Sequence, residues 1–101
     1  NYQKDLKNSE GFSRSIRSLG RAWEGGSQAG PLDNKSRALI KLAISTGARL
    51  EGAVHSHTGK ALEAGCSKEK ILQTVMLALP TIGLPSTMAA LSWVEDVLEK
   101  K

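Results

Sequence analysis

Hydrophobic residues recur at helical spacing along most of the chain, and no segment shows the sustained alternation typical of strands. The first stripe repeats at i, i+4, i+7 and i+11 of a predicted amphipathic helix over residues 9–24, and it consists of Phe12, Ile16, Leu19 and Trp23. Residues 24–31, which follow, are rich in glycine and typical of a flexible connection. The pattern therefore predicts an all-α protein that opens with a helix and a hinge.

Two further helices are predicted over residues 34–50 and 51–64. Asp33 can cap the first of them, because its carboxylate can accept a hydrogen bond from a first-turn N–H. Gly65 stands where a residue in the left-handed conformation ends the second. The face of the 34–50 helix that we expect to pack inside the fold carries Leu39, Ile40, Ala43, Ile44 and Gly47.

The last two helices are predicted over residues 67–79 and 84–99. Ser67 caps the first of these and Pro80 ends it, while Pro85 suits the first turn of the second. One side of the 84–99 helix is expected to be lined by Leu84, Met88, Leu91, Val94 or Glu95, and Leu98. The complete expectation is a compact bundle of about five helices.

We expect a single domain over residues 1–101, with residues 1–31 as the N-terminal helix and connection and residues 32–101 as the core. Residues 71–94 carry no charge and are long enough to cross a membrane, but prolines, Gly83 and several hydroxyl side chains interrupt them. Two buried helices are the better interpretation. Because only 4% of the residues are aromatic, the core is thin, and residues 71–94 are predicted to meet another subunit. The N-terminal helix is a second possible contact.

The charge and the cysteine content exclude several classes of protein. The net charge is +4, but acids lie among the scattered basic residues, so neither a nucleic-acid-binding surface nor a membrane-binding one is predicted. The single cysteine excludes an intramolecular disulfide framework and a Cys-rich zinc site, and it favours a cytoplasmic location. No secretory leader is recognisable, and a chain that begins with Asn1 leaves room for residues upstream.

The two histidines, His55 and His57, both fall within the predicted 51–64 helix. Side chains two residues apart on a helix point about 200° apart, so they cannot hold one metal ion together, and no metal site is predicted. Val54 and Ala61 place His57 on the apolar stripe, where burial would favour a neutral imidazole that can act as a base. The alternative is a core histidine that donates to a backbone carbonyl. His55 is expected to be exposed.

Other polar residues offer weaker chemistry. Cys66 lies near a helix N-terminus, where a thiol becomes more reactive, although a small apolar filler is the favoured interpretation. Glu51 and Glu63 are each six residues from His57, so neither shares its helix face. A partner for His57 must therefore come from another helix or chain, and the nearest cations in sequence are Arg37, Arg49 and Lys60.

Four segments in order carry a family resemblance: Leu32–Ile40, His57–Gly65, Ser67-x-Glu69-x-Ile71 and Ile82–Pro85. Together they resemble the carboxymuconolactone decarboxylase family, which includes the alkylhydroperoxidase D-type peroxidases. The resemblance covers Leu32 to Leu98. It implies an all-α, alkylhydroperoxidase D-like fold, a homo-oligomer (commonly a trimer or hexamer), and a pocket near His57, often at a subunit contact.

The peroxidase branch of that family has a Cys-x-x-Cys-x-x-x-His pattern with an upstream Glu. Carried over position by position, the cysteines fall on Leu50 and Ala53 and the Glu falls on Ala38, so only His57 is retained. Cys66 lies many residues away and is no substitute. Because thiol peroxidase chemistry requires a thiolate and a resolving thiol, this activity is disfavoured.

The decarboxylase branch also lacks the cysteines and is the nearer relative. Its members tend to have an acid four residues before the histidine and a basic residue two after it, where this chain has Ala53 and Gly59. The resemblance implies a lyase in which His57 exchanges a proton with a small organic acid, with no cofactor. The alternative is a non-catalytic oligomeric binding or scaffold protein of the same fold, and a thiol peroxidase is third.

Overall fold

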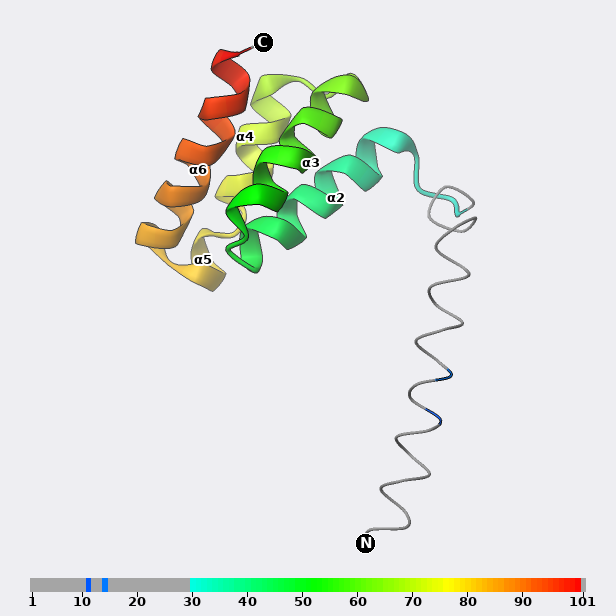
Figure 1. The fold of residues 1–101 in the computed structure, drawn as a ribbon, viewed down its shortest axis with the longest axis horizontal. Helices are drawn as coiled ribbons and strands as arrows, with labels where there is room; N and C mark the ends of the chain where they lie inside the picture. The colour runs from blue at the N-terminus through cyan, green and yellow to red at the C-terminus, as the bar shows by residue number, and fades with distance from the viewer. Residues whose placement is uncertain (1–10, 12–13, 15–29, 101) are drawn as a thin grey trace, which may run out of the picture. The chain divides into compact units, whose positions relative to one another are not determined.

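The computed structural model describes Gly11, Arg14 and residues 30–100. Most of the helix predicted over residues 9–24, and almost all of the connection after it, lie outside these described residues. The chain divides into two units, Asn1–Leu32 and Asp33–Lys101, and the second contains the helices shown in Figure 1. All the regular structure in residues 30–100 is helical, which confirms the predicted fold class.

The second unit is built from four longer helices and one single turn, in the order α2 (Asn34–Gly47), α3 (Glu51–Glu63), α4 (Lys68–Met76), α5 (Leu79–Ile82) and α6 (Leu84–Glu99). Both predicted caps are present. The Asp33 carboxylate accepts a hydrogen bond from the Ser36 N–H at 2.7 Å, and the Ser67 hydroxyl accepts one from the Lys70 N–H at 3.2 Å. Each bond satisfies a backbone donor that the helix itself leaves unpaired.

The helices α2 and α3 end in the same way, with a left-handed residue one position beyond the cap. At the end of α3 this residue is Gly65, with a φ of 93°, as predicted. At the end of α2 it is Arg49, with a φ of 58°, and in both places two backbone N–H groups bond back to the last turn. A side chain in this conformation is strained, so the turn between α2 and α3 holds Arg49 at a cost.

The predicted 67–79 helix is shorter than expected, because α4 ends at Met76 and Pro80 lies in the first turn of α5 instead of ending α4. Proline is tolerated there because first-turn N–H groups have no partner within a helix. Gly83, with a φ of 85°, separates α5 from α6. Pro85 occupies the first turn of α6, as the sequence predicted.

The core lies where α3 packs between α2 and α6, with α4 laid across all three (Figure 1). The large aliphatic side chains buried in it are Leu42, Val54, Ile71, Val75, Val94 and Leu98. No helix among the described residues has the length and apolar character needed to cross a membrane.

The inward face of α2 is not the one predicted from its apolar pattern. Ile40 and Ile44 are 44% and 65% exposed, and the buried positions are Ala38, Leu42, Ser45 and Thr46. The two hydroxyl groups can be buried cheaply, because each donates to a carbonyl of its own helix: Ser45 to Lys41 at 2.8 Å and Thr46 to Leu42 at 2.9 Å.

The face predicted for α6 is likewise divided between core and surface. Val94 and Leu98 are buried together with Thr87 and Ala90, as expected for an inward stripe. Leu84 and Met88, which were expected on the same side, are 59% and 55% exposed. Each of these two helices therefore has an outer face whose large apolar side chains stay exposed in the described part of the chain.

Candidate functional site

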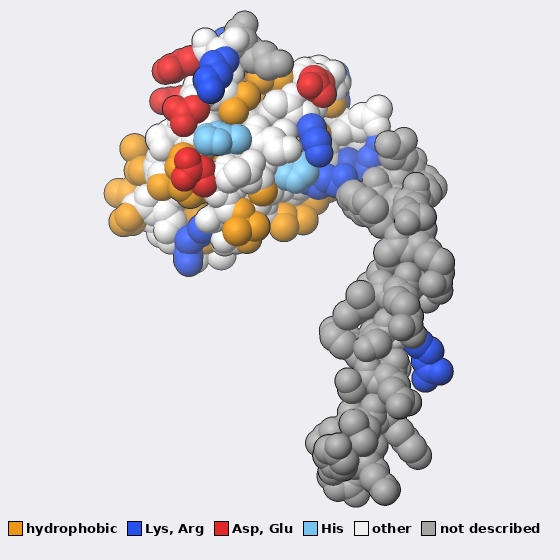
Figure 2. Space-filling view, viewed as in Figure 1, with side chains coloured by type: hydrophobic (Ala, Val, Ile, Leu, Met, Phe, Trp, Pro, Cys, Tyr) orange, Lys and Arg blue, Asp and Glu red, His pale blue; other side chains and the backbone are white. Residues whose placement is uncertain are grey.

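The helix α3 presents its two histidines to two different neighbours. His57 and His55 are both half-buried, and they flank the buried stripe of Val54, Thr58 and Ala61. Figure 2 shows them as two separate pale-blue patches on the surface. The prediction that they cannot share a ligand follows from helix geometry and agrees with this arrangement.

His57 is a neutral imidazole next to two cations. Its Nδ1 atom is buried and has no hydrogen-bond partner in the described part of the chain. Burial is the main cause that lowers the pKa of His57, and the positive charges of Lys60 and Lys41 lower it further. Near pH 7 the ring is therefore uncharged and can accept a proton.

The two lysines come from different helices. Lys60 is one turn after His57 on α3 and was among the cations expected near it, whereas Lys41 belongs to α2 and sequence reasoning missed it. A signal was available, because Lys41 and His57 are each eight residues from Arg49, in the turn that joins the helices. Residues equidistant from a tight turn lie at the same level of an antiparallel helix pair. Arg37 and Arg49, the other two cations nearest to His57 in sequence, are not among the charges that shift its pKa.

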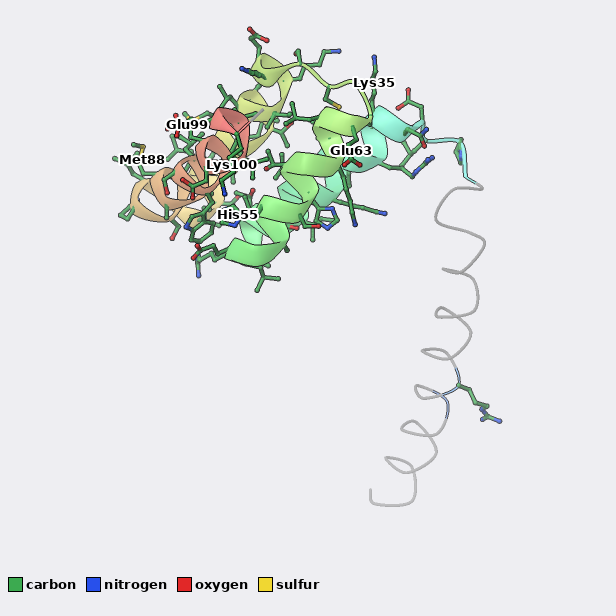
Figure 3. All side chains as sticks on the ribbon, turned by 45° about the horizontal axis from the view of Figure 1, so that its top comes forward. Lys35, His55, Glu63, Met88, Glu99 and Lys100 are labelled. Carbon is green, nitrogen blue, oxygen red and sulfur yellow. The ribbon has the colours of Figure 1, made fainter. Side chains whose placement is uncertain are left out.

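His55 faces α6 and is less exposed than predicted. Its Nε2 atom lies 3.4 Å from Asp96 Oδ2, without hydrogen-bond geometry. The pair lines a shallow hollow together with Val97, Glu99 and Lys100, and Figure 3 shows His55 on the same side of the bundle as Lys100. This pair connects α3 to the end of α6 and contributes nothing to the surroundings of His57.

Cys66 is buried and packs in the hydrophobic core as a small apolar residue. Its side chain is only 5% exposed, and Sγ lies 3.7 Å from the Lys35 carbonyl oxygen. Cys66 follows the C-terminal end of α3, whereas Leu50, which stands where the peroxidase branch has a cysteine, precedes its N-terminal end and is exposed. Cys66 lies nine residues after His57 in sequence, and α3 ends between them.

Thr58, next to His57, is fully buried, and its hydroxyl has no hydrogen-bond partner in the described structure. Two other fully buried threonines, Thr46 and Thr87, each donate to the carbonyl four residues earlier. Because its hydroxyl is unsatisfied, Thr58 destabilises α3 at the position directly after His57. Among residues 30–100, no group of three His, Cys, Asp or Glu side chains is arranged to hold a metal ion.

Comparison with known proteins supplies two similarities. The model of the carboxymuconolactone decarboxylase family matches residues 16–96. The crystal structure of the apo form of a carboxymuconolactone decarboxylase family protein from Legionella pneumophila superposes with a TM-score of 0.68 at 22% sequence identity, covering 96% of this chain and 87% of that one. At this identity the likeness shows the fold. No curated protein is significantly similar in sequence.

Proposed function

The chain belongs to the carboxymuconolactone decarboxylase family, and we propose that it is a decarboxylase-like lyase that acts on a small organic acid through His57. The observation that carries the proposal is the half-buried imidazole of His57. Its Nδ1 atom has no hydrogen-bond partner among the described residues, and the charges of Lys60 and Lys41 lower its pKa. An acid–base group and a site for a carboxylate are the two parts such a reaction needs.

The lysines would hold the carboxylate that is not lost. An ammonium group is a compact point charge suited to this task, and Lys41 is half-buried, which strengthens its attraction for an anion. A bound carboxylate would also offset the positive charges that lower the pKa of His57. Substrate binding therefore favours uptake of a proton by the imidazole.

The proton taken up by His57 is the one that the product needs after loss of CO₂. Loss of CO₂ breaks a carbon–carbon bond and leaves the electron pair on the substrate as a carbanion or enolate. The imidazolium of His57 donates its proton to that carbon and returns to the neutral form, and solvent replaces the proton in the next turnover. Nearby positive charge stabilises the developing anion.

The test uses a panel of small lactone acids and oxo acids that carry a second carboxylate, in D₂O, with CO₂ release and carbon-bound deuterium as the readouts. His57→Gln is expected to lower kcat by about 100-fold or more, the usual contribution of general acid–base catalysis. His55→Gln is the matched control and should retain activity. Equal turnover by the wild type and His57→Gln would overturn the proposal.

Two outcomes would instead support the alternatives. Saturable binding of an acid without turnover would identify a binding protein of this fold. Peroxide-dependent turnover that Cys66→Ser abolishes would identify a thiol peroxidase. We place the protein in the cytoplasm on the basis of its single cysteine.

We also propose that the working form is a homo-oligomer, a trimer or a hexamer, with residues 71–94 in the interface. Four large hydrophobic side chains in this segment are exposed: Met76, Leu77, Leu84 and Met88. An uncharged surface of this kind is stabilised when a second copy removes it from water.

A further inference from the structure

We infer that α6 of one copy packs antiparallel on α2 of the next copy, and that Arg37 meets Glu95 of the partner subunit at the edge of this contact. The inference rests on the proposed homo-oligomer and adds the surface that receives residues 71–94. Two outer helix faces that are exposed in the described part of the chain are its starting point.

Both faces are apolar where a helix surface is usually polar. On α2 the face is formed by Ile40 and Ile44, and on α6 by Leu84 and Met88. Large exposed hydrophobic residues outnumber the large aliphatic residues buried in the core of residues 30–100. Packing within these residues therefore leaves much of their apolar surface in contact with water, and a partner that covers this surface would be stabilising.

The charges beside the two faces are opposite in sign. Arg37 lies on the same side of α2 as Ile40 and Ile44, at helical spacings of three and seven residues. Glu95 lies on the same side of α6 as Met88, seven residues further along. Complementary charge around complementary apolar surface favours a second copy of this chain as the occupant.

The spacing sets the direction of the contact. From Arg37 to Ile44 and from Met88 to Glu95 there are seven residues, or about 10.5 Å along each helix axis. The cation precedes the apolar pair on α2, whereas the acid follows it on α6. Antiparallel packing therefore places Ile44 against the partner's Met88 while Arg37 reaches the partner's Glu95.

The two faces belong to different helices of the bundle, so one copy can contact two neighbours through them. The helices α2 and α6 lie on opposite flanks of α3, and Figure 3 shows Met88 at the opposite side of the bundle from Lys35, which lies at the start of α2. Each copy therefore offers α6 in one direction and α2 in another. Such head-to-tail contacts form a ring where the rotation between copies closes and an open filament where it does not.

The test is a charge exchange on the full chain, with mass measured by sedimentation velocity over a range of concentrations. Arg37→Glu and Glu95→Arg each place like charges in contact and are expected to raise the dissociation constant at least about tenfold. The double variant restores the attraction and should regain the wild-type mass. Glu63→Arg, which changes an exposed acid at the end of α3, is the matched control.

Misfolding does not imitate the expected result. Arg37→Glu removes the hydrogen bond from the Arg37 guanidinium to the Asn34 side chain. An acid in the first turns of α2 and a base near the end of α6 both complement the helix dipole, so each single variant should still fold. Circular dichroism melts check this. A wild type that is monomeric at every concentration overturns the oligomer and this contact together, whereas assembly unaffected by the single variants, or not restored by the double one, overturns the contact alone.

Discussion

Replacing Thr58 with valine should stabilise the protein. Thr58 is fully buried, and its hydroxyl has lost its hydrogen bonds to water without finding a partner among the described residues. Valine has nearly the same shape, so the change removes a polar atom and opens no cavity. Thr46 and Thr87 are equally buried but bonded, at 2.9 Å and 2.8 Å, and they provide matched comparisons.

The magnitude follows from the cost of an unsatisfied polar group. Leaving a buried donor or acceptor unpaired costs about 1–3 kcal/mol, so Thr58→Val should raise the free energy of unfolding by about 1–2 kcal/mol. Since about 1 kcal/mol shifts the Tm of a chain of this size by at least about 4 °C, the change is easily measured. Thr46→Val and Thr87→Val lose a bond and should be neutral or less stable by up to about 1 kcal/mol.

The measurement is urea denaturation of all three variants at one protein concentration, because assembly would otherwise shift the apparent stability. The ranking is the decisive result, with Thr58→Val above the wild type and the other two at or below it. If Thr58→Val were the least stable, the hydroxyl would have a partner in solution, such as an ordered water. Thr58 would then not be an unsatisfied polar group of α3.

The charges around His57 and the backbone conformation at the two helix ends can also be tested. In NMR titrations, Lys60→Met and Lys41→Met should each raise the pKa of His57, with the larger change from Lys60; no change from either would show that the lysines lie too far away. Folding lowers the pKa of His57 from its ordinary value of 6.5, so the unfolded state binds more protons just below that pH. The free energy of unfolding should therefore decrease as the pH drops through this range. His57→Gln should make this decrease smaller. Arg49→Gly should raise the free energy of unfolding by about 0.5–1 kcal/mol, since the left-handed conformation suits glycine. Gly65→Ala should lower the free energy of unfolding, because alanine is strained in that conformation and its methyl group meets the Lys35 side chain. Calorimetry that shows the opposite signs would contradict the left-handed conformation of both residues.

Local chemistry allowed the helices to be predicted from their ends. Asp33 and Ser67 cap their helices because a side-chain oxygen reaches a backbone donor three residues away. Gly65 ends α3 because glycine, which has no Cβ, adopts a positive φ without strain. These are short-range effects that a sequence displays directly. The end of α4 was misplaced because Pro80 is equally acceptable in the first turn of a new helix.

The inward faces were harder to predict, because several faces of α2 were chemically acceptable. Ile40 and Ile44 are more apolar than Ser45 and Thr46, yet the latter are buried. Their hydroxyl groups satisfy themselves within the helix, so the usual penalty for burying a polar group is small. The prediction that the isoleucines pack inside the fold is wrong, and we propose that they pack between copies.

The sequence alone determined the helical class, the caps, the family and His57 as the candidate acid–base residue, because each depends on neighbours within a few residues or on an ordered motif. Only the tertiary structure decided which charges surround that histidine. Lys41 comes beside it through the antiparallel packing of α2 on α3, and His55 pairs with Asp96 through the packing of α6. Electrostatic effects depend on distance in space, so residues far apart in the chain could be assigned to His57 only after the fold had brought them together.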